Sequence, residues 1–209
     1  MFPNERNFIL NENASYGGKN DKTGLYHSWL QSSSINHWFP WLKKRLLADG
    51  VKADILNMPN PLQPRLEDWL DTLSLYQHTL HENTYLVAHS LGCPAILRFL
   101  EHIQLRKQLG GIILVSGFAK SLPTLKMLDE FTQGSFDHQK IIESAKHRAV
   151  IASKDDQIVP FSFSKDLAQQ IDAALYEVQH GGHFLEDEGF TSLPIVYDVL
   201  TSYFSKETR

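Results

Sequence analysis

The sequence predicts an α/β fold, in which a parallel sheet lies between two layers of helices. From about residue 37 onward, strand-like segments alternate with amphipathic helical segments, the order typical of a parallel sheet. Residues 111–116 (Gly-Ile-Ile-Leu-Val-Ser) are almost continuously apolar, as in a parallel strand buried on both faces. Residues 84–102 run from an apolar strand through a short turn into a helix. Right-handed crossovers then place the loops that carry function at the carboxyl edge of the sheet.

The individual elements follow from apolar spacing and from the residues that break it. Trp38 and Leu42 lie on one helical face, and Gly50 ends that helix. Two prolines close together, Pro59 and Pro61, predict a loop. The predicted strands are 52–57, 84–88, 111–116, 148–153 and 174–178, and the predicted helices are 37–47, 66–80, 94–102, 163–171 and 193–204, with helical patterns and a loop within 119–147.

The composition excludes several classes of protein. The 209 residues include 20 Lys and Arg against 24 Asp and Glu, a net charge of −4, so nucleic acid is not an expected partner. The single cysteine, Cys93, cannot form an internal disulfide, which fits a reducing cytosol. No apolar run approaches the roughly 18 residues of a membrane span, and the polar residues 1–18 lack the apolar stretch of a signal peptide. We therefore expect a cytoplasmic protein that does not act at a membrane.

The most informative segment is Ala88-His89-Ser90-Leu91-Gly92, which joins the strand ending at Ala88 to the next helix. A serine on so sharp a strand-to-helix turn is a nucleophile elbow. The turn admits only small residues two positions to either side, and Ala88 and Gly92 meet that requirement. The hydroxyl of Ser90 then lies at the carboxyl edge of the sheet, and the Leu91 N–H at the helix N-terminus is a candidate oxyanion donor. The alternative is an ordinary turn that happens to contain serine.

A serine hydroxyl needs a base, and the base needs a carboxylate to orient it. Residues 153–160 (Ser-Lys-Asp-Asp-Gln-Ile-Val-Pro) follow a strand and supply the acid. We choose Asp156, three residues before Val159, and interpret Asp155 as a solvated loop carboxylate. The glycines of Gly181-Gly182-His183 allow the chain to bring His183 back over the sheet edge. His180 is the competing histidine, and we interpret it as a cap of the strand end. A metal bound by His180 and His183 is not expected, because no third ligand is nearby.

These motifs, together with His37-Trp38-Phe39-Pro40-Trp41, resemble the YdeN-type small bacterial hydrolases, which belong with the retinoblastoma-binding-protein-9-like serine hydrolases. The resemblance covers about residues 33–209. It implies a minimal three-layer α/β-hydrolase fold with little or no lid and a triad of Ser90, Asp156 and His183. It also implies a small ester or amide substrate. We expect no cofactor or metal. The retinoblastoma-binding peptide Leu-x-Cys-x-Glu is not present, since the segment that begins at Leu91 ends in Ala95.

The N-terminus departs from this family. Such hydrolases begin with an apolar strand that ends in His-Gly, and the following loop supplies a second oxyanion N–H. Here the expected glycine falls on Trp29. Codons can be chosen for residues 16–29 so that a reading frame shifted by one base encodes Met-Thr-Lys-Gln-Val-Tyr-Ile-Ile-His-Gly. A ribosome-binding sequence then lies just upstream of this second frame. A compensating shift near Ser32 returns the chain to the family pattern. We therefore interpret residues 1–32 as an aberrant or disordered segment produced by a reading-frame error, and residues 33–209 as the hydrolase domain.

The expected function is a serine hydrolase, carboxylesterase-like, that acts through an acyl-enzyme. The alternative is a hydrolase-fold protein that only binds, or an impaired variant that lacks the first strand and the His-Gly loop. A nucleotide-binding protein is a weaker interpretation, because no glycine-rich phosphate motif follows a strand.

Overall fold

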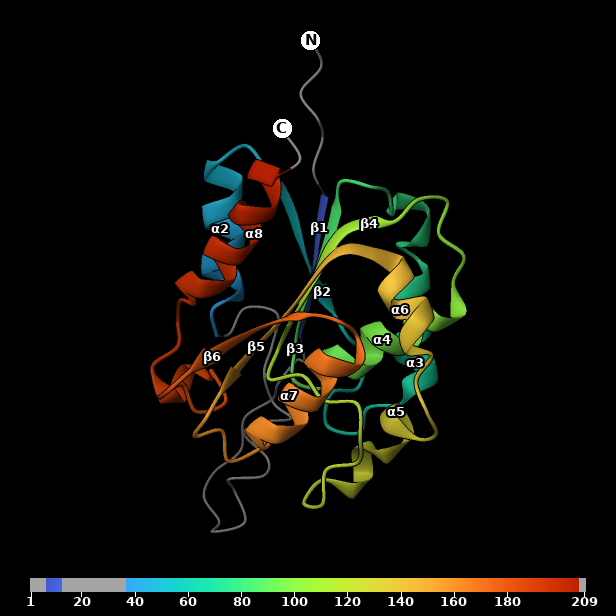
Figure 1. Cartoon of the computed structure of the whole chain (residues 1–209), viewed down its shortest axis with the longest axis vertical. Coiled ribbons are helices and arrows are strands. Elements are labelled where there is room, and N and C mark those ends of the chain that lie inside the picture. Colours follow the sequence, from blue (N-terminus) through green and yellow to red (C-terminus); the bar gives the residue numbers. More distant parts are fainter. Residues whose placement is uncertain (1–6, 13–36, 207–209) are drawn as a thin grey trace.

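A computed structural model of the chain describes residues 7–12 and 37–206. The described strands form one six-stranded sheet in which all neighbours are parallel, in the order β2-β1-β3-β4-β5-β6 (Figure 1). The strands are β1 (Asn7–Glu12), β2 (Lys52–Asn57), β3 (Thr84–His89), β4 (Leu109–Val115), β5 (Ala145–Ser153) and β6 (Ala174–Val178).

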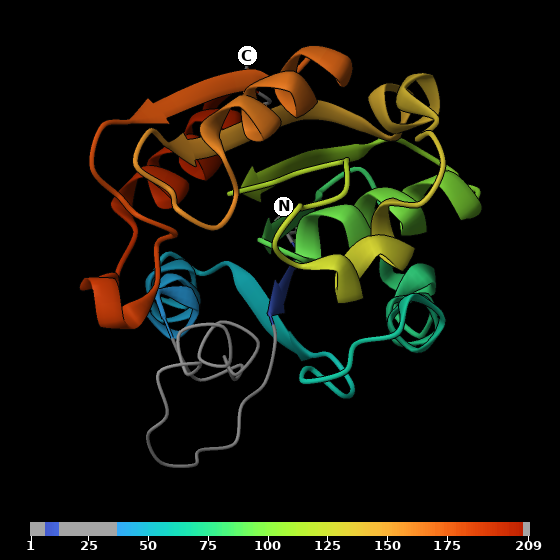
Figure 2. The same cartoon turned by 90° about the horizontal axis from the view of Figure 1, so that it is seen from below.

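Helices cover both faces of this sheet (Figures 1 and 2). They are α2 (Phe39–Ala48), α3 (Leu66–Ser74), α4 (Gly92–His102), α5 (Asp129–Thr132), α6 (His138–Ser144), α7 (Phe161–Gln170) and α8 (Pro194–Lys206), with short 3-10 turns η1 (Gln77–Thr79), η2 (Lys126–Leu128) and η3 (Glu186–Glu188). Helices α2 and α8 pack on one face and α3 to α7 on the other, so the three-layer α/β class is confirmed.

Strand β3 shows why the sheet needs helices on both sides. All six of its residues are buried. Successive side chains point to opposite faces of a strand, so Tyr85 and Val87 join the core under α2 and α8 while Leu86 and Ala88 join the core under α3 to α7. Each fully buried Val or Leu side chain stabilises the fold by about 1.5–3 kcal/mol. This double burial fixes the strand that leads into Ser90.

The strand order creates the position for a site. The chain runs from β1 outward to β2, then returns past β1 to β3 and continues through β4, β5 and β6. The direction of winding therefore reverses between β1 and β3. In open α/β sheets, ligands bind outside the carboxyl ends of the strands at such a switch point. Ser90 is the first residue after β3 and lies at this point.

The segment set apart in the sequence analysis contributes a strand. Residues 7–12 form β1, which pairs with β2 on one side and β3 on the other. Its register places Leu10 opposite Ile55 and Val87. The rest of 1–36 lies outside the described residues. This range includes Trp29, the position at which the sequence predicts the glycine of the second oxyanion loop.

Most predicted elements are present, with shifted ends. Strands 52–57 and 174–178 are as predicted, whereas the helix predicted over 66–80 ends at Ser74. The Ser74 hydroxyl donates to the Leu70 carbonyl at 2.7 Å, and Leu75 is 71% exposed, so no apolar stripe continues the helix. Strand β5 begins at Ala145, three residues before the predicted start.

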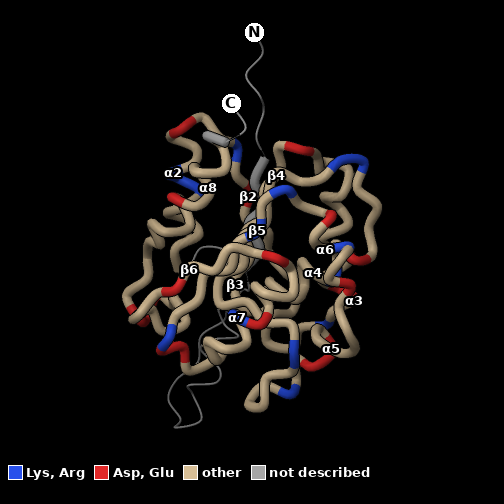
Figure 3. Tube along the Cα trace, in the orientation of Figure 1, with Lys and Arg blue, Asp and Glu red and all other residues tan. Residues whose placement is uncertain are grey.

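Acidic and basic residues are intermixed along the trace (Figure 3). This distribution agrees with the small net charge of −4. Over residues 7–12 and 37–206, no helix combines the length and the apolar character that crossing a membrane requires.

Candidate active site

Ser90 occupies a sharp turn between β3 and α4. Its φ of +53° lies in the left-handed region that side chains rarely adopt. Hydrogen bonds hold this conformation: the Ser90 N–H donates to the Val115 carbonyl at 2.9 Å, and the Cys93 N–H donates to the Ser90 carbonyl at 2.9 Å. Ala88 is fully buried in the core, so the sheet accommodates the extra methyl group that this chain carries where the usual elbow has glycine.

The structure brings Ser90, His183 and Asp156 together in one hydrogen-bonded chain. Ser90 Oγ lies 2.8 Å from His183 Nε2, and His183 Nδ1 lies 2.8 Å from Asp156 Oδ2. The side chains of His183 and Asp156 are each 2% exposed. A carboxylate only accepts hydrogen bonds, so Nδ1 carries the proton and Nε2 is left as the acceptor of the Ser90 hydroxyl. These are the three residues that the sequence analysis selects.

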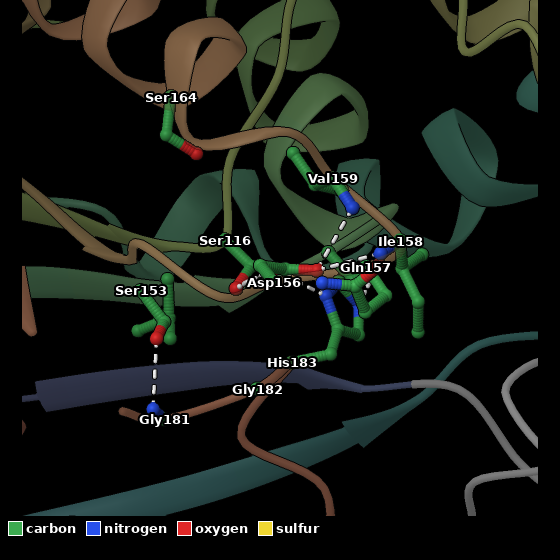
Figure 4. Close-up of polar contacts among 12 residues, drawn as sticks. Ser116, Ser153, Asp156, Gln157, Ile158, Val159, Ser164, Gly181, Gly182 and His183 are labelled. Carbon is green, nitrogen blue, oxygen red and sulfur yellow. Dashed lines mark hydrogen bonds and ion pairs between the residues drawn. The ribbon is translucent and has the colours of Figure 1, made fainter. Parts of the chain in front are cut away.

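Asp156 has a donor for every lone-pair direction of its carboxylate (Figure 4). Oδ1 accepts the N–H groups of Ile158 at 2.8 Å and Val159 at 2.9 Å. Oδ2 accepts His183 Nδ1–H and also the hydroxyl of Ser116 at 2.9 Å. A buried carboxylate is stable as an anion when it is paired and fully hydrogen-bonded in this way.

Asp155 is a loop carboxylate with a side chain that is 43% exposed, but it also makes contacts that the sequence does not predict. Its Oδ1 accepts the N–H groups of Gly181 at 3.0 Å and Gly182 at 2.9 Å, and also the Ser153 hydroxyl at 2.5 Å. The Ser153 hydroxyl and these two N–H groups hold the pKa of the Asp155 carboxyl well below its usual range. Asp155 therefore anchors the backbone that leads into His183, an arrangement that spacing alone does not reveal.

His180 lies outside the hydrogen-bonded chain. Its side chain is 90% exposed, and its Nδ1 lies 3.3 Å from Asp155 Oδ2. Among the described residues, no group of three or more His, Cys, Asp or Glu side chains is placed to hold a metal ion.

Two residues that the sequence analysis passes over fix the backbone around His183. Glu188 Oε2 accepts the N–H of His183 at 2.8 Å and the N–H of Leu185 at 3.0 Å. His89 Nε2 donates to the His183 carbonyl at 2.8 Å. Burial lowers the pKa of His89 well below its usual value, so the ring is neutral with its proton on Nε2. The only sequence signal for His89 is its place beside Ser90.

His37 links the start of the described domain to the same loop. Its backbone N–H donates to the Glu186 carboxylate at 3.2 Å, and the Glu186 N–H donates to His37 Nδ1 at 2.8 Å. Burial lowers the pKa of His37. The first motif of the resemblance therefore serves to fasten the loop after His183.

Leu91 follows Ser90 directly and is the N-cap residue of α4. The first N–H groups of an α-helix have no acceptor within the helix, and they carry the positive end of its dipole. Cys93 lies buried behind the turn, with Sγ 3.5 Å from the Val115 carbonyl. An oxygen beside Ser90 would thus meet a helix N-terminus backed by a packed core.

Comparison with known proteins agrees with this geometry. Residues 25–202 match the family described as Serine hydrolase. The chain is 97% identical over 179 residues to the hydrolase YdeN of Bacillus subtilis (strain 168), covering 86% of this chain and 94% of that protein. It is 29% identical over 169 residues to Serine hydrolase RBBP9 of Rattus norvegicus, covering 78% and 87%. The crystal structure of the B. subtilis ydeN gene product superimposes with a TM-score of 0.86 at 84% identity, covering 96% of this chain and 99% of that chain.

Proposed function

The chain belongs to the serine hydrolase family, and from that premise we propose that it hydrolyses a small ester or amide through an acyl-enzyme. Ser90 is the nucleophile, His183 the general base and then the general acid, and Asp156 the residue that orients His183. The observation that carries the proposal is the unbroken chain of hydrogen bonds from Ser90 Oγ through both nitrogens of His183 to Asp156, at 2.8 Å each.

The reaction follows from the position of each proton. As Ser90 Oγ attacks the substrate carbonyl carbon, its proton passes to His183 Nε2, and the carbonyl oxygen becomes an oxyanion. His183 then gives that proton to the oxygen or nitrogen of the leaving group, the bond to the leaving group breaks, and the acyl group remains on Ser90. In the second half, a water molecule loses a proton to His183 and attacks the acyl-enzyme. Departure of Ser90 Oγ with the proton from His183 restores the enzyme.

Asp156 supports the charged form of His183 that arises in each half-reaction. Its carboxylate accepts Nδ1–H, which keeps Nε2 facing Ser90 and stabilises the imidazolium. Since both side chains are 2% exposed, little water competes with this interaction.

The oxyanion is stabilised by the N–H of Leu91 at the start of α4. In enzymes of this type a second N–H comes from the loop after the first strand, which here lies among residues 13–36, outside the described part of the chain. A missing donor would lower turnover about 10²–10³-fold, so the oxyanion hole determines whether this exact chain is a fast or a slow enzyme.

An active-site serine probe tests the proposal. We expect a fluorophosphonate to label the folded protein on the peptide that contains Ser90, as located by mass spectrometry. Labelling should vanish in Ser90→Ala and after heat denaturation of the wild type. A folded wild-type protein that neither reacts with the probe nor hydrolyses p-nitrophenyl acetate would overturn the proposal and favour the alternative, a hydrolase-fold protein that only binds.

A further inference from the structure

We propose that Ser116 is a positioning residue for the reaction: its hydroxyl fixes the Asp156 carboxylate in the orientation that receives His183. This inference rests on the proposed function. Ser116 follows β4, the strand next to the one that carries the nucleophile, and is fully buried. No sequence motif points to it, because its role depends on a contact across 40 residues of chain.

The two oxygens of Asp156 are held in different ways. Oδ1 accepts the N–H groups of Ile158 and Val159, which belong to the same loop and move with it. Oδ2, the oxygen that receives His183 Nδ1–H, is tied to the rest of the fold by the Ser116 hydroxyl at 2.9 Å. Figure 4 shows Ser116 reaching Asp156 from outside the Asp156 loop. Ser116 therefore couples the acid to the sheet rather than to its own turn.

The backbone of Ser116 repeats the turn of the nucleophile on the neighbouring strand. Ser90 has a φ of +53° and Ser116 a φ of +48°. The Ser90 N–H donates to the Val115 carbonyl of β4, and the Ser116 N–H donates to the Ile151 carbonyl of β5, both at 2.9 Å. Because His89 is in register with Val115, the two serines lie at the same level of the sheet. The nucleophile and the support of the acid are thus set by two equivalent turns.

The residue type at this position also supports a role for the hydroxyl. Glycine adopts a φ near +50° without strain, whereas other residues carry a conformational cost there. Ser116 has this strained φ although it is fully buried and lies directly before Gly117. A side chain kept under strain in such a place is explained by the hydrogen bond that it makes.

The test compares Ser116→Gly and Ser116→Ala with Ser164→Ala. Ser164 is a matched control, since it is also buried and its hydroxyl donates at 2.7 Å to the carbonyl of Gly117, the residue after Ser116. Ser116→Gly removes the hydroxyl and the strain together, so it remains folded even if Ser116→Ala does not. We expect both Ser116 variants to lower kcat for p-nitrophenyl acetate about 10- to 100-fold with KM within about 2-fold. Ser164→Ala should keep kcat within about 2-fold of the wild type.

A pH profile separates positioning from a merely structural role. The Ser116 hydroxyl contacts the carboxylate oxygen that receives His183, so its loss changes the interaction within the pair. The acid limb of kcat/KM should therefore shift in Ser116→Gly and stay in place in Ser164→Ala. The proposal is overturned if folded Ser116→Gly keeps the wild-type kcat and pH profile. Fluorophosphonate labelling distinguishes a failure of this inference from a failure of the proposed function. If Ser90 is labelled in the wild type and at the same rate in Ser116→Gly, only the role of Ser116 is wrong. If Ser90 is not labelled in the folded wild type, the proposed function is wrong.

Discussion

Gly182→Ala probes the link between the His183 loop and its support. Gly182 has a φ of +51°, and a Cβ placed there would overlap Glu188 Oε1 and lie 2.7 Å from Oε2. The Glu188 carboxylate would have to move, and it is the group that accepts the N–H of His183 and of Leu185. One added methyl group therefore acts on the backbone of the proposed general base without touching its ring.

The magnitude follows from three contributions. Alanine at a left-handed φ costs about 1–2 kcal/mol, and the stiffer unfolded chain returns about 0.4–1 kcal/mol. Loss of two hydrogen bonds to a charged group would add several kcal/mol if they were buried. Because Glu188 is exposed and water can replace it, we discount this contribution to about 1–2 kcal/mol. We expect Gly182→Ala to lower the free energy of unfolding by about 2–3 kcal/mol and kcat by about 10²-fold, since a displacement near 1 Å has that effect.

The assay is urea unfolding followed by circular dichroism, together with ester hydrolysis by the folded variant. Gly50→Ala is the matched control, because Gly50 has a φ of +76° and nothing lies within 4 Å of the position that a Cβ would take there. It should lose about 1 kcal/mol of stability and no activity. If Gly182→Ala and Gly50→Ala behave alike in both measurements, the support of His183 by Glu188 is refuted.

The remaining predictions concern the turn, the loop and the reading frame. Ser90→Gly should unfold at higher urea than Ser90→Ala, with a gain of about 1 kcal/mol from the relieved positive φ; equal midpoints would contradict the strain at the elbow. His89→Leu should lower kcat about 10-fold because it leaves the His183 carbonyl without its buried donor, and His89→Gln, whose amide can replace Nε2–H, should restore most of it in the same ester assay. Asp155 has a depressed pKa in the folded state, so its contribution to stability is present above about pH 4 and is lost as the pH falls below that value. In Asp155→Asn, urea midpoints should therefore depend less on pH in this acid range, and an unchanged dependence would contradict the anchoring contacts. Finally, the codons of residues 16–32 should encode Val-Tyr-Ile-Ile-His-Gly in a second reading frame. A DNA sequence that lacks this frame would refute the hypothesis of a reading-frame error.

The sequence is sufficient to predict the residues whose roles depend on local pattern. A serine between small residues, an acid after a strand and a histidine after two glycines each have a spacing signature, and the structure brings Ser90, Asp156 and His183 within hydrogen-bond distance. Strands β2 and β6 are predicted to the residue, and turn-forming residues lie close to them: Gly50 and Pro59 around β2, and Gly181 after β6.

The supporting contacts cannot be predicted in this way, because they form only when distant loops meet. Glu188 and His89 act on backbone groups of the His183 loop, and Asp155 acts on glycine N–H groups 26 and 27 residues away. Such contacts leave no periodicity and no spacing in the sequence. Strand β1 escapes prediction for another reason: its short apolar core is flanked by asparagines, and its place comes from pairing on both sides.

The central place of β1 also has a consequence for how the chain folds. Among the strands that the structure describes, β2 is at the edge of the sheet and pairs with β1 alone. Its connection to the other described strands therefore runs through Asn7–Glu12. Asn7 is in register with Lys52 and with Thr84, contacts that close long loops. Loops of this length must be ordered before their contacts stabilise the sheet, which slows folding. We therefore expect β1 and β2 to be the last strands to settle and the insertion of β1 to limit the refolding rate.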